Sequence, residues 1–420
     1  MITSGTGAKT FSGLVAVSTS ATWNNSGNSA VTFHGGITNS GTFTAGSGIH
    51  TFNTSPQALT GTLSIPSVTV TGIALTNNND LTISNSLAGS GNLTQATTGN
   101  LTLGGGVSIT TLDASASGNT VIYNGSGQNI LATTYHNLNI NQSGGQASLV
   151  GATTVNGTLT LSNGNLSIGS NNLLLGAAAV SVASPSASKM IIASGSGEVR
   201  RTFTATGSYL FPIGDNTGTL EYSPITVNYT SGSFSSAYVG VSVTDAKHPF
   251  NASTTNYLTR YWSINQSGIT GGSATITAQY PAADITGTEG SIKAAHLSGA
   301  FNQVTNPWTK YNVLGANTFS ISTPVNIVAG TTSYCTGVTG SDPSVTITGA
   351  PFTICNGGSV VLPANPTGGD GPYTYSWAPT AGLTATTIKI RLHHLHPLRI
   401  MLSLFAMRTE PWQPAMLTSM

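Results

Sequence analysis

The sequence predicts an all-β chain that begins as a parallel β-helix, and three observations support this fold class. Charged residues make up 5% of the 420 residues, against about 25% in ordinary soluble domains. Thr, Val, Ile and Leu favour strands, whereas the many Gly and Asn residues supply turns that need positive φ. Short aliphatic triplets recur from about residue 30 to 178, each followed by a Gly, Asn or Ser turn. With 38% apolar residues and a net charge of +1, the chain should fold rather than stay disordered.

The triplets are interpreted as very short strands of one solenoid. A strand of three residues places two side chains on one face, and it is stable only if neighbours stack around a shared interior. Triplets beginning at Leu159, Leu166 and Leu173 start seven residues apart. Three such sides give a coil of about 20 residues, as in a parallel β-helix. An antiparallel up-and-down arrangement is the alternative, although hairpin strands usually run about 5 to 6 residues. Other clear triplets are Leu81-Thr82-Ile83, Leu101-Thr102-Leu103, Val107-Ser108-Ile109 and Leu138-Asn139-Ile140.

The composition changes after Pro185, and longer alternating runs such as residues 223–229 and 237–243 predict a β-sandwich. Further on, residues 371–377 look like part of an Ig-like module of the polycystic-kidney-disease type, which implies that Trp377 is its buried strand-C aromatic. We therefore expect four regions: β-helical repeats at 1–188, a β-sandwich at 189–333, a partial Ig-like module at 334–388 and a tail at 389–420.

The tail differs from everything before it. Residues 389–420 contain four of the six methionines, three of the eight histidines and none of the 51 glycines. Plausible codons from Lys389 onward, read two bases later, encode Asn-Pro-Thr-Ala-Ser-Pro-Thr-Pro-Thr-Thr-Tyr-Asn-Val, which continues the Ig-like pattern. We expect the tail to be frame-shifted, non-native sequence. Its histidine cluster, His393, His394 and His396, is then not a metal site.

Two sets of phrases resemble known exported proteins. Between Thr120 and Gly176 the chain carries Tyr123-Asn124-Gly125-Ser126-Gly127-Gln128, Thr153-Thr154-Val155-Asn156-Gly157 and Asn171-Asn172-Leu173-Leu174-Leu175. These resemble the β-helical repeats of large Bacteroidetes surface and adhesin-like proteins. The later phrases Phe211-Pro212-Ile213-Gly214-Asp215 and Asp245-Ala246-Lys247-His248-Pro249 are similar to a domain that follows such repeats in proteins exported by type IX secretion. The resemblance implies an extracellular or outer cell-surface location and no active site.

Charge and hydropathy exclude several partners. With a net charge of +1 and no basic run before residue 389, we expect neither nucleic-acid nor anionic-lipid binding. No stretch approaches the roughly 20 apolar residues of a membrane span. Residues 1–13 lack the charged and apolar regions of a signal peptide, so we expect the natural start, with its signal peptide, to lie upstream of Met1.

Candidate catalytic residues are few. Glycoside hydrolysis generally uses two carboxylates about 5 to 9.5 Å apart, yet residues 1–188 carry only Lys9, Asp80 and Asp113 as charged side chains. Both aspartates are expected to cap turns. The expected sandwich adds acidic and histidine residues without metal-ligand spacing, and a solvated loop is the favoured interpretation of the group at 245–248. Asp215, which follows Ile213-Gly214, is expected to form a turn. A Ca²⁺ site of loop carboxylates is conceivable there, with no ligands assigned; no other cofactor is expected. These residues are Asp215, Glu221, Asp245, His248, Asp284 and Glu289.

The two cysteines, Cys335 and Cys355, form a candidate disulfide if the module is oxidised. The alternative partner of Cys355 is a cysteine that the frame shift removed. Neither cysteine has a basic or histidine neighbour in the sequence, so a nucleophilic thiol is not expected.

These observations favour a non-enzymatic, secreted or cell-surface structural and adhesion protein, with surface glycans or extracellular matrix as partners. A carbohydrate-binding or carbohydrate-active β-helix is the alternative. Rows of Thr on a solenoid can also order water or bind ice, but the Thr positions look irregular in the sequence, so we expect them to be ordinary solvated positions.

Overall fold

The structure is a computed structural model that describes most of the chain and divides it into two compact units. The described residues are 7–177, 182–302, 305–340, 344–347, 359–367, 377–378, 390–394, 402–404 and 415–417. The first unit comprises residues 1–225, 233–243 and 266–270, and the second comprises 226–232, 244–265 and 271–420. Nearly all regular structure is β, as predicted, and the first unit contains a parallel solenoid of about ten turns.

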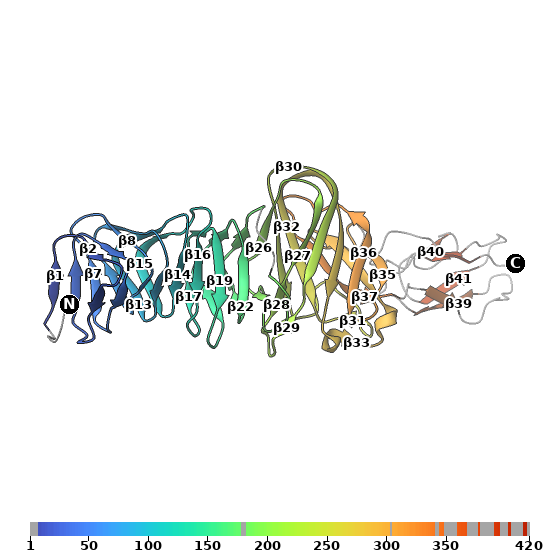
Figure 1. Ribbon diagram of the computed structural model, residues 1–420. Coiled ribbons are helices and arrows are strands. Elements are labelled where there is room, and N and C mark those ends of the chain that lie inside the picture. The colour runs from blue at the N-terminus through green and yellow to red at the C-terminus, as the bar shows by residue number, and fades with distance from the viewer. Residues whose placement is uncertain are drawn as a thin grey trace. The chain divides into compact units, whose positions relative to one another are not determined.

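The first sheet of the solenoid holds ten strands in parallel register (Figure 1). Its order is β1-β4-β7-β10-β13-β11-β8-β5-β2, and β15 also pairs with β13. The strands are β1 (Lys9–Phe11), β2 (Val15–Val17), β4 (Val31–Phe33), β5 (Ile37–Asn39), β7 (Ile49–Phe52), β8 (Gln57–Thr60), β10 (Ser67–Val70), β11 (Ala74–Asn77), β13 (Ser86–Gln95) and β15 (Gly106–Asp113). The pair β3 (Thr22–Asn24) and β6 (Thr42–Thr44) completes the early coils.

The second sheet shows why the triplets form strands. It comprises β9 (Leu63–Ser64), β12 (Leu81–Ile83), β14 (Asn100–Leu103), β16 (Thr120–Tyr123), β19 (Asn137–Asn141) and β22 (Leu159–Asn163). Parallel register places Leu81 beside Leu101, which in turn lies beside Val121, and all three side chains are buried. Full burial of such a side chain contributes about 1.5–3 kcal/mol, so stacking supplies the stability that a single triplet lacks. The parallel pairing rules out the antiparallel alternative for these strands.

The three triplets spaced by seven residues lie on three different sides of one coil, as predicted. Leu159 starts β22, whereas Leu166 starts β23 (Leu166–Ser167) and Leu173 starts β24 (Leu173–Leu175). These strands belong to three separate sheets. The other strands on the two later sides are β17 (Asn129–Ile130), β18 (Thr134–Tyr135), β20 (Ala147–Leu149) and β21 (Thr153–Val155).

The parallel ladder extends beyond residue 188. β25 (Ile191–Ile192) pairs in parallel with β23, and β28 (Ile213–Asp215) pairs in parallel with β25. β26 (Val199–Phe203) pairs in parallel with β24 and antiparallel with β30 (Ile225–Thr244). The antiparallel pairing of β26 with β30 ends the parallel ladder on that side, while β28 continues it on the side of β25. The predicted boundary at 188 remains a prediction about domains, because the ladder by itself does not define one.

The second unit is built from antiparallel strands compatible with a β-sandwich. β37 (Ser333–Thr339) lies between β32 (Tyr261–Gln279) and β34 (Ile292–Ser298), β34 also pairs with β35 (Thr309–Val313), and β32 pairs with β36 (Thr318–Val325). Ala295, Leu297, Trp308 and Val338 form a buried apolar cluster. Shorter elements are β27 (Gly207–Phe211) and β29 (Glu221–Tyr222) in the first unit, and β31 (Tyr257–Leu258), β33 (Ile285–Thr286) and the 3-10 turns η1 (Ala282–Asp284) and η2 (Glu289–Ser291) in the second.

Most of the predicted Ig-like module and tail lies outside the described residues. β38 (Ser344–Ile347) pairs antiparallel with β39 (Ser359–Thr367). The side chain of Trp377, the residue Cys355 and most of 389–420 are not described, so the burial of Trp377 and the frame shift stay predictions. Among the described residues, no helix has the length and apolar character needed to cross a membrane.

Candidate functional site

Of the two solenoid carboxylates, Asp113 caps a turn, as predicted, whereas Asp80 binds the backbone of the next coil instead of its own turn. An Asp80 carboxylate oxygen accepts a hydrogen bond from the Asn100 N–H at 2.7 Å, which links adjacent coils. Asp113 accepts hydrogen bonds from the N–H and the hydroxyl of Ser115, at 3.1 and 2.7 Å. Asp80 precedes β12, while Asp113 ends β15 in a different sheet. Each carboxylate therefore has a local structural role.

Asp215 and Glu221 are opposite each other on β28 and β29, in the first unit. Asp215 is buried and accepts a hydrogen bond from the Thr217 N–H at 3.0 Å. This is the geometry of an Asx turn, so the predicted turn-forming role is confirmed. Glu221 lies 3.3 Å from the Thr219 hydroxyl, which donates to it.

In the second unit, Arg260 organises two of the predicted acidic residues. Its fully buried guanidinium pairs with the Asp284 carboxylate and lies 3.6 Å from an Asp245 oxygen. The backbone of Arg260 is held as well, because the Thr336 hydroxyl donates to its carbonyl at 2.7 Å. A buried pair of this kind leaves a costly isolated charge if one partner is removed, so the arrangement is structural.

His248 is buried, so the prediction of a solvated loop is wrong at this residue. Its ring lies 4.6–5.0 Å, centroid to centroid, from the rings of Tyr261, Trp308 and Tyr334. Nδ1 accepts the Phe250 N–H at 3.2 Å. Burial lowers the pKa of His248 to about 4, because the aromatic surroundings cannot solvate an imidazolium. The neutral ring is a core residue here.

Glu289 and Cys335 also occupy structural positions. A Glu289 oxygen accepts hydrogen bonds from the Tyr280 hydroxyl and the Asn317 N–H, both at 2.8 Å. Cys335 is buried in the middle of β37, and burial raises the pKa of its thiol. Its register partner on β34 is His296, which burial keeps neutral by lowering its pKa to about 4. A protonated thiol beside a neutral imidazole is a poor nucleophile. The disulfide with Cys355 stays a prediction.

The outer face of the first sheet carries a regular threonine row that sequence inspection missed. Parallel register aligns Thr10 with Thr32, Thr32 with Thr51, and Thr51 with Thr69. Ala88 follows in the same row. The sequence intervals between these threonines are unequal, yet the parallel register places them in one continuous row. The expectation that they are ordinary solvated positions stays a prediction. Differences in coil length are absorbed at the corners, while the ladder keeps the row straight.

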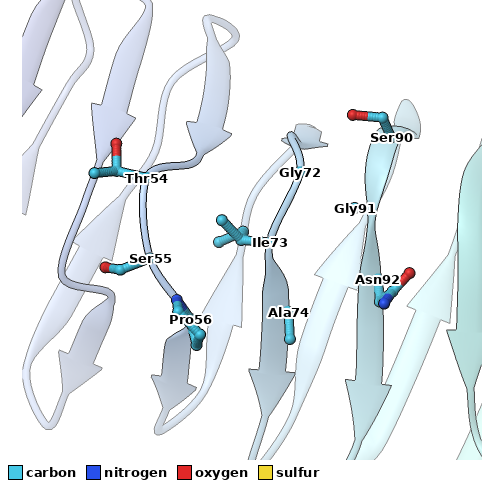
Figure 2. A pocket seen from close by; sticks show the side chains of 9 residues that line it. All are labelled: Thr54, Ser55, Pro56, Gly72, Ile73, Ala74, Ser90, Gly91 and Asn92. Atoms are coloured by element: carbon cyan, nitrogen blue, oxygen red, sulfur yellow. The ribbon is translucent and has the colours of Figure 1, made fainter.

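An open groove lies at the corner next to this row, with a volume of about 350 Å³. Three stretches of successive coils line it: residues 54–56, 72–74 and 90–92 (Figure 2). The stretches are evenly spaced along the sequence, one coil apart. Register pairs Ala74 with Asn92, so residues at equivalent positions lie side by side along the solenoid axis. The lining contains no charged side chain.

Sequence reasoning did not find the groove residues. The available signal was the even, one-coil spacing of the three stretches together with small residues, Gly72 and Gly91, at the corner. Gly72 has a φ of +65°, a conformation that glycine adopts without strain.

No protein-family model matches the chain, and the searches of curated proteins and of solved structures found no match either.

Proposed function

We propose that this chain is a non-catalytic structural and adhesive part of a secreted or cell-surface protein. The observation that carries the proposal is the division of the solenoid into an apolar interior and a neutral exterior of hydroxyls and amides. The side chains of Leu81, Leu101 and Val121 form a buried interior row. The next residue along each of the first two strands, Thr82 and Thr102, faces outward. This construction favours a stiff spacer whose surface meets other molecules without ionic selectivity.

The positions of the carboxylates support a non-catalytic role. Asp80 and Asp113 both accept hydrogen bonds from neighbouring turns. Hydrolysis of a glycosidic bond generally needs a protonated and an ionised carboxyl group on opposite sides of the bond. In the second unit, Asp284 neutralises the buried Arg260. Glu289 accepts hydrogen bonds from the Tyr280 hydroxyl and the Asn317 N–H, and so links two connecting segments.

The resemblance to exported Bacteroidetes surface proteins supports the same proposal, including export by type IX secretion. An extracellular location also fits the neutral outer surface of the solenoid, because extracellular matrices and cell walls are rich in uncharged sugars and hydroxylated polymers that such a surface can contact.

Bead adhesion tests the adhesive function. Beads coated with the full chain should be retained under shear flow on surfaces of immobilised cell-wall or matrix polysaccharide, and albumin-coated beads should wash off. Equal loss of both kinds of bead on every surface would contradict an adhesive role.

The second candidate is a carbohydrate-binding or carbohydrate-active β-helix. The groove at residues 54–56, 72–74 and 90–92 supports sugar binding, although its lining carries no carboxylate for catalysis. Incubation of the chain with polysaccharides separates the two candidates. New reducing ends, or the ultraviolet absorbance of unsaturated lyase products, would establish catalysis and contradict the proposal above. Retention without product is the expected result.

A further inference from the structure

We propose that the corner groove binds a neutral polysaccharide whose chain lies parallel to the solenoid axis. This inference rests on the proposed adhesive function, because it names the partner and the surface that meets it.

The direction of the ligand follows from the repetition of the lining. Thr54, Gly72 and Ser90 are equivalent positions on three successive coils, since each is one full coil from the next in the sequence. Parallel strands lie about 4.8 Å apart. Polar side chains therefore lie on the first and third coils, two strand spacings or about 10 Å apart along the axis, and a polymer with recurring hydroxyl groups can meet both sets at once.

The shape of the groove suits a chain of sugar rings. Gly72 leaves open space at the corner, because a Cβ atom placed there would meet nothing within 4 Å. Ile73 is half-buried and Gly91 is buried, while Pro56, Ala74 and Asn92 are exposed along one side. Figure 2 shows the Ile73 side chain standing between the first and third stretches. The apolar surface of Ile73 and Pro56 can contact the C–H face of a pyranose, and a few polar groups then fix its orientation.

The polar groups match sugar hydroxyls. Within the described residues, the Ser90 hydroxyl and the Asn92 side-chain amide make no hydrogen bond, so both are available. An amide offers two donors and an accepting oxygen, which can engage adjacent hydroxyls of one sugar. The Thr54 and Ser55 hydroxyls donate to the Asn53 side chain and the His34 carbonyl, and their lone pairs remain able to accept.

The charge distribution selects against ionic polymers. The lining has no Lys or Arg to neutralise a uronate or sulfate, and a carboxylate bound there would lose hydration without gaining an ion pair. Adjacent to the groove, the row of Thr10, Thr32, Thr51 and Thr69 extends the neutral hydroxylated surface over four coils. A polymer longer than the groove can continue onto this face.

Affinity electrophoresis of the full chain tests the proposal. Native gels would contain hydroxyethylcellulose, xylan, galactomannan or laminarin as neutral probes, with polygalacturonate and alginate as anionic probes. At least one neutral polymer should retard the protein, and the anionic polymers should not. Retardation by no neutral polymer, or equal retardation by the anionic ones, would overturn the proposal.

Two groove variants and a matched control locate the binding. Ala74→Trp and Ser90→Trp place an indole in the groove from exposed positions and should weaken retardation at least tenfold. Thr62→Trp adds the same ring at an exposed position outside the groove and should leave retardation unchanged. Circular dichroism checks that all three fold. Unchanged retardation of both groove variants would overturn the assignment to the groove. If beads coated with either groove variant are still retained on the polysaccharide surface, the assignment of binding to the groove is contradicted, whereas the adhesive function is supported.

Discussion

The hydroxyl oxygens of Tyr123 and Tyr135 lie 2.8 Å apart inside the solenoid. The Tyr135 hydroxyl donates to the Leu131 carbonyl at 2.8 Å, and the Leu131 N–H donates to the Tyr123 oxygen at 3.3 Å. The Tyr123 hydroxyl therefore donates to the Tyr135 oxygen. The three hydrogen bonds form a closed ring that runs through both hydroxyls and the backbone N–H and carbonyl of Leu131. Burial raises the pKa of Tyr123 to about 12 and raises that of Tyr135 well above its usual value, so both stay neutral. This ring satisfies polar groups in an otherwise apolar interior.

Removing either hydroxyl should destabilise the first unit. Tyr123→Phe leaves the Leu131 N–H without its acceptor, and a buried unsatisfied group costs about 1–3 kcal/mol. Tyr135→Phe likewise leaves the Leu131 carbonyl without its donor. Because the two share one ring, the double variant should cost less than the sum, by about 0.5–3 kcal/mol. Urea unfolding measures this, with the half-buried Tyr238→Phe as a control expected within about 0.5 kcal/mol. Additive losses would argue against the ring.

The alternation within one triplet predicts opposite outcomes at adjacent residues. Leu101 is fully buried between Leu81 and Val121, so Leu101→Ala should cost about 2–5 kcal/mol. Thr102 faces outward, and Thr102→Ala should stay within about 0.5 kcal/mol. Denaturant unfolding of both variants checks the assignment. Similar losses at the two positions would mean that the strand does not separate interior from exterior.

Removing the counter-charge of the buried Arg260 should strongly destabilise the second unit. Asp284→Asn leaves a buried guanidinium without its main counter-charge, and breaking a buried pair typically costs about 3–5 kcal/mol. The double variant Arg260→Met with Asp284→Leu should be less destabilised than Asp284→Asn alone, since the one carboxylate that it leaves without Arg260, that of Asp245, is partly exposed. The control is Arg200→Met, which removes a part-exposed pair with Glu198 worth about 0–1 kcal/mol. Stability that is unchanged in Asp284→Asn would contradict the structural role.

The second unit should lose stability in mild acid. His248 and His296 both have pKa values lowered by burial from 6.5 to about 4. Between these two pH values the unfolded chain binds more protons than the folded one. The contribution of the two histidines to the free energy of unfolding is therefore fully present above pH 6.5 and falls as the pH drops toward 4. Each histidine should account for up to about 3 kcal/mol of this loss. Thermal unfolding across this range should show a shallower pH dependence in the double variant His248→Gln, His296→Gln. An unchanged slope would assign the acid sensitivity to other groups.

Local patterns in the sequence were sufficient for several features. Aliphatic triplets such as Leu159-Thr160-Leu161 predicted strands, their interior faces and their grouping in threes, because alternation and turn residues act over a few positions. The turn-capping roles of Asp113 and Asp215 were predictable for the same reason, whereas the hydrogen bond of Asp80 to the next coil was not. His248 was not, since the rings of Tyr261, Trp308 and Tyr334 that bury it come from distant strands.

The sequence by itself determined that this protein is a charge-poor β-solenoid with an aliphatic interior, because side-chain alternation and turn preference are short-range properties. Only the tertiary structure decided which outward residues are neighbours. Thr32 lies beside Thr51, and Thr51 lies beside Thr69, although the two sequence intervals differ. The alignment is not visible in the sequence because the corners between strands differ in length. It is set by the hydrogen bonds between strands of adjacent coils. The groove beside them exists for the same reason, since stacking places three corners, with Gly72 at the middle one, on one line.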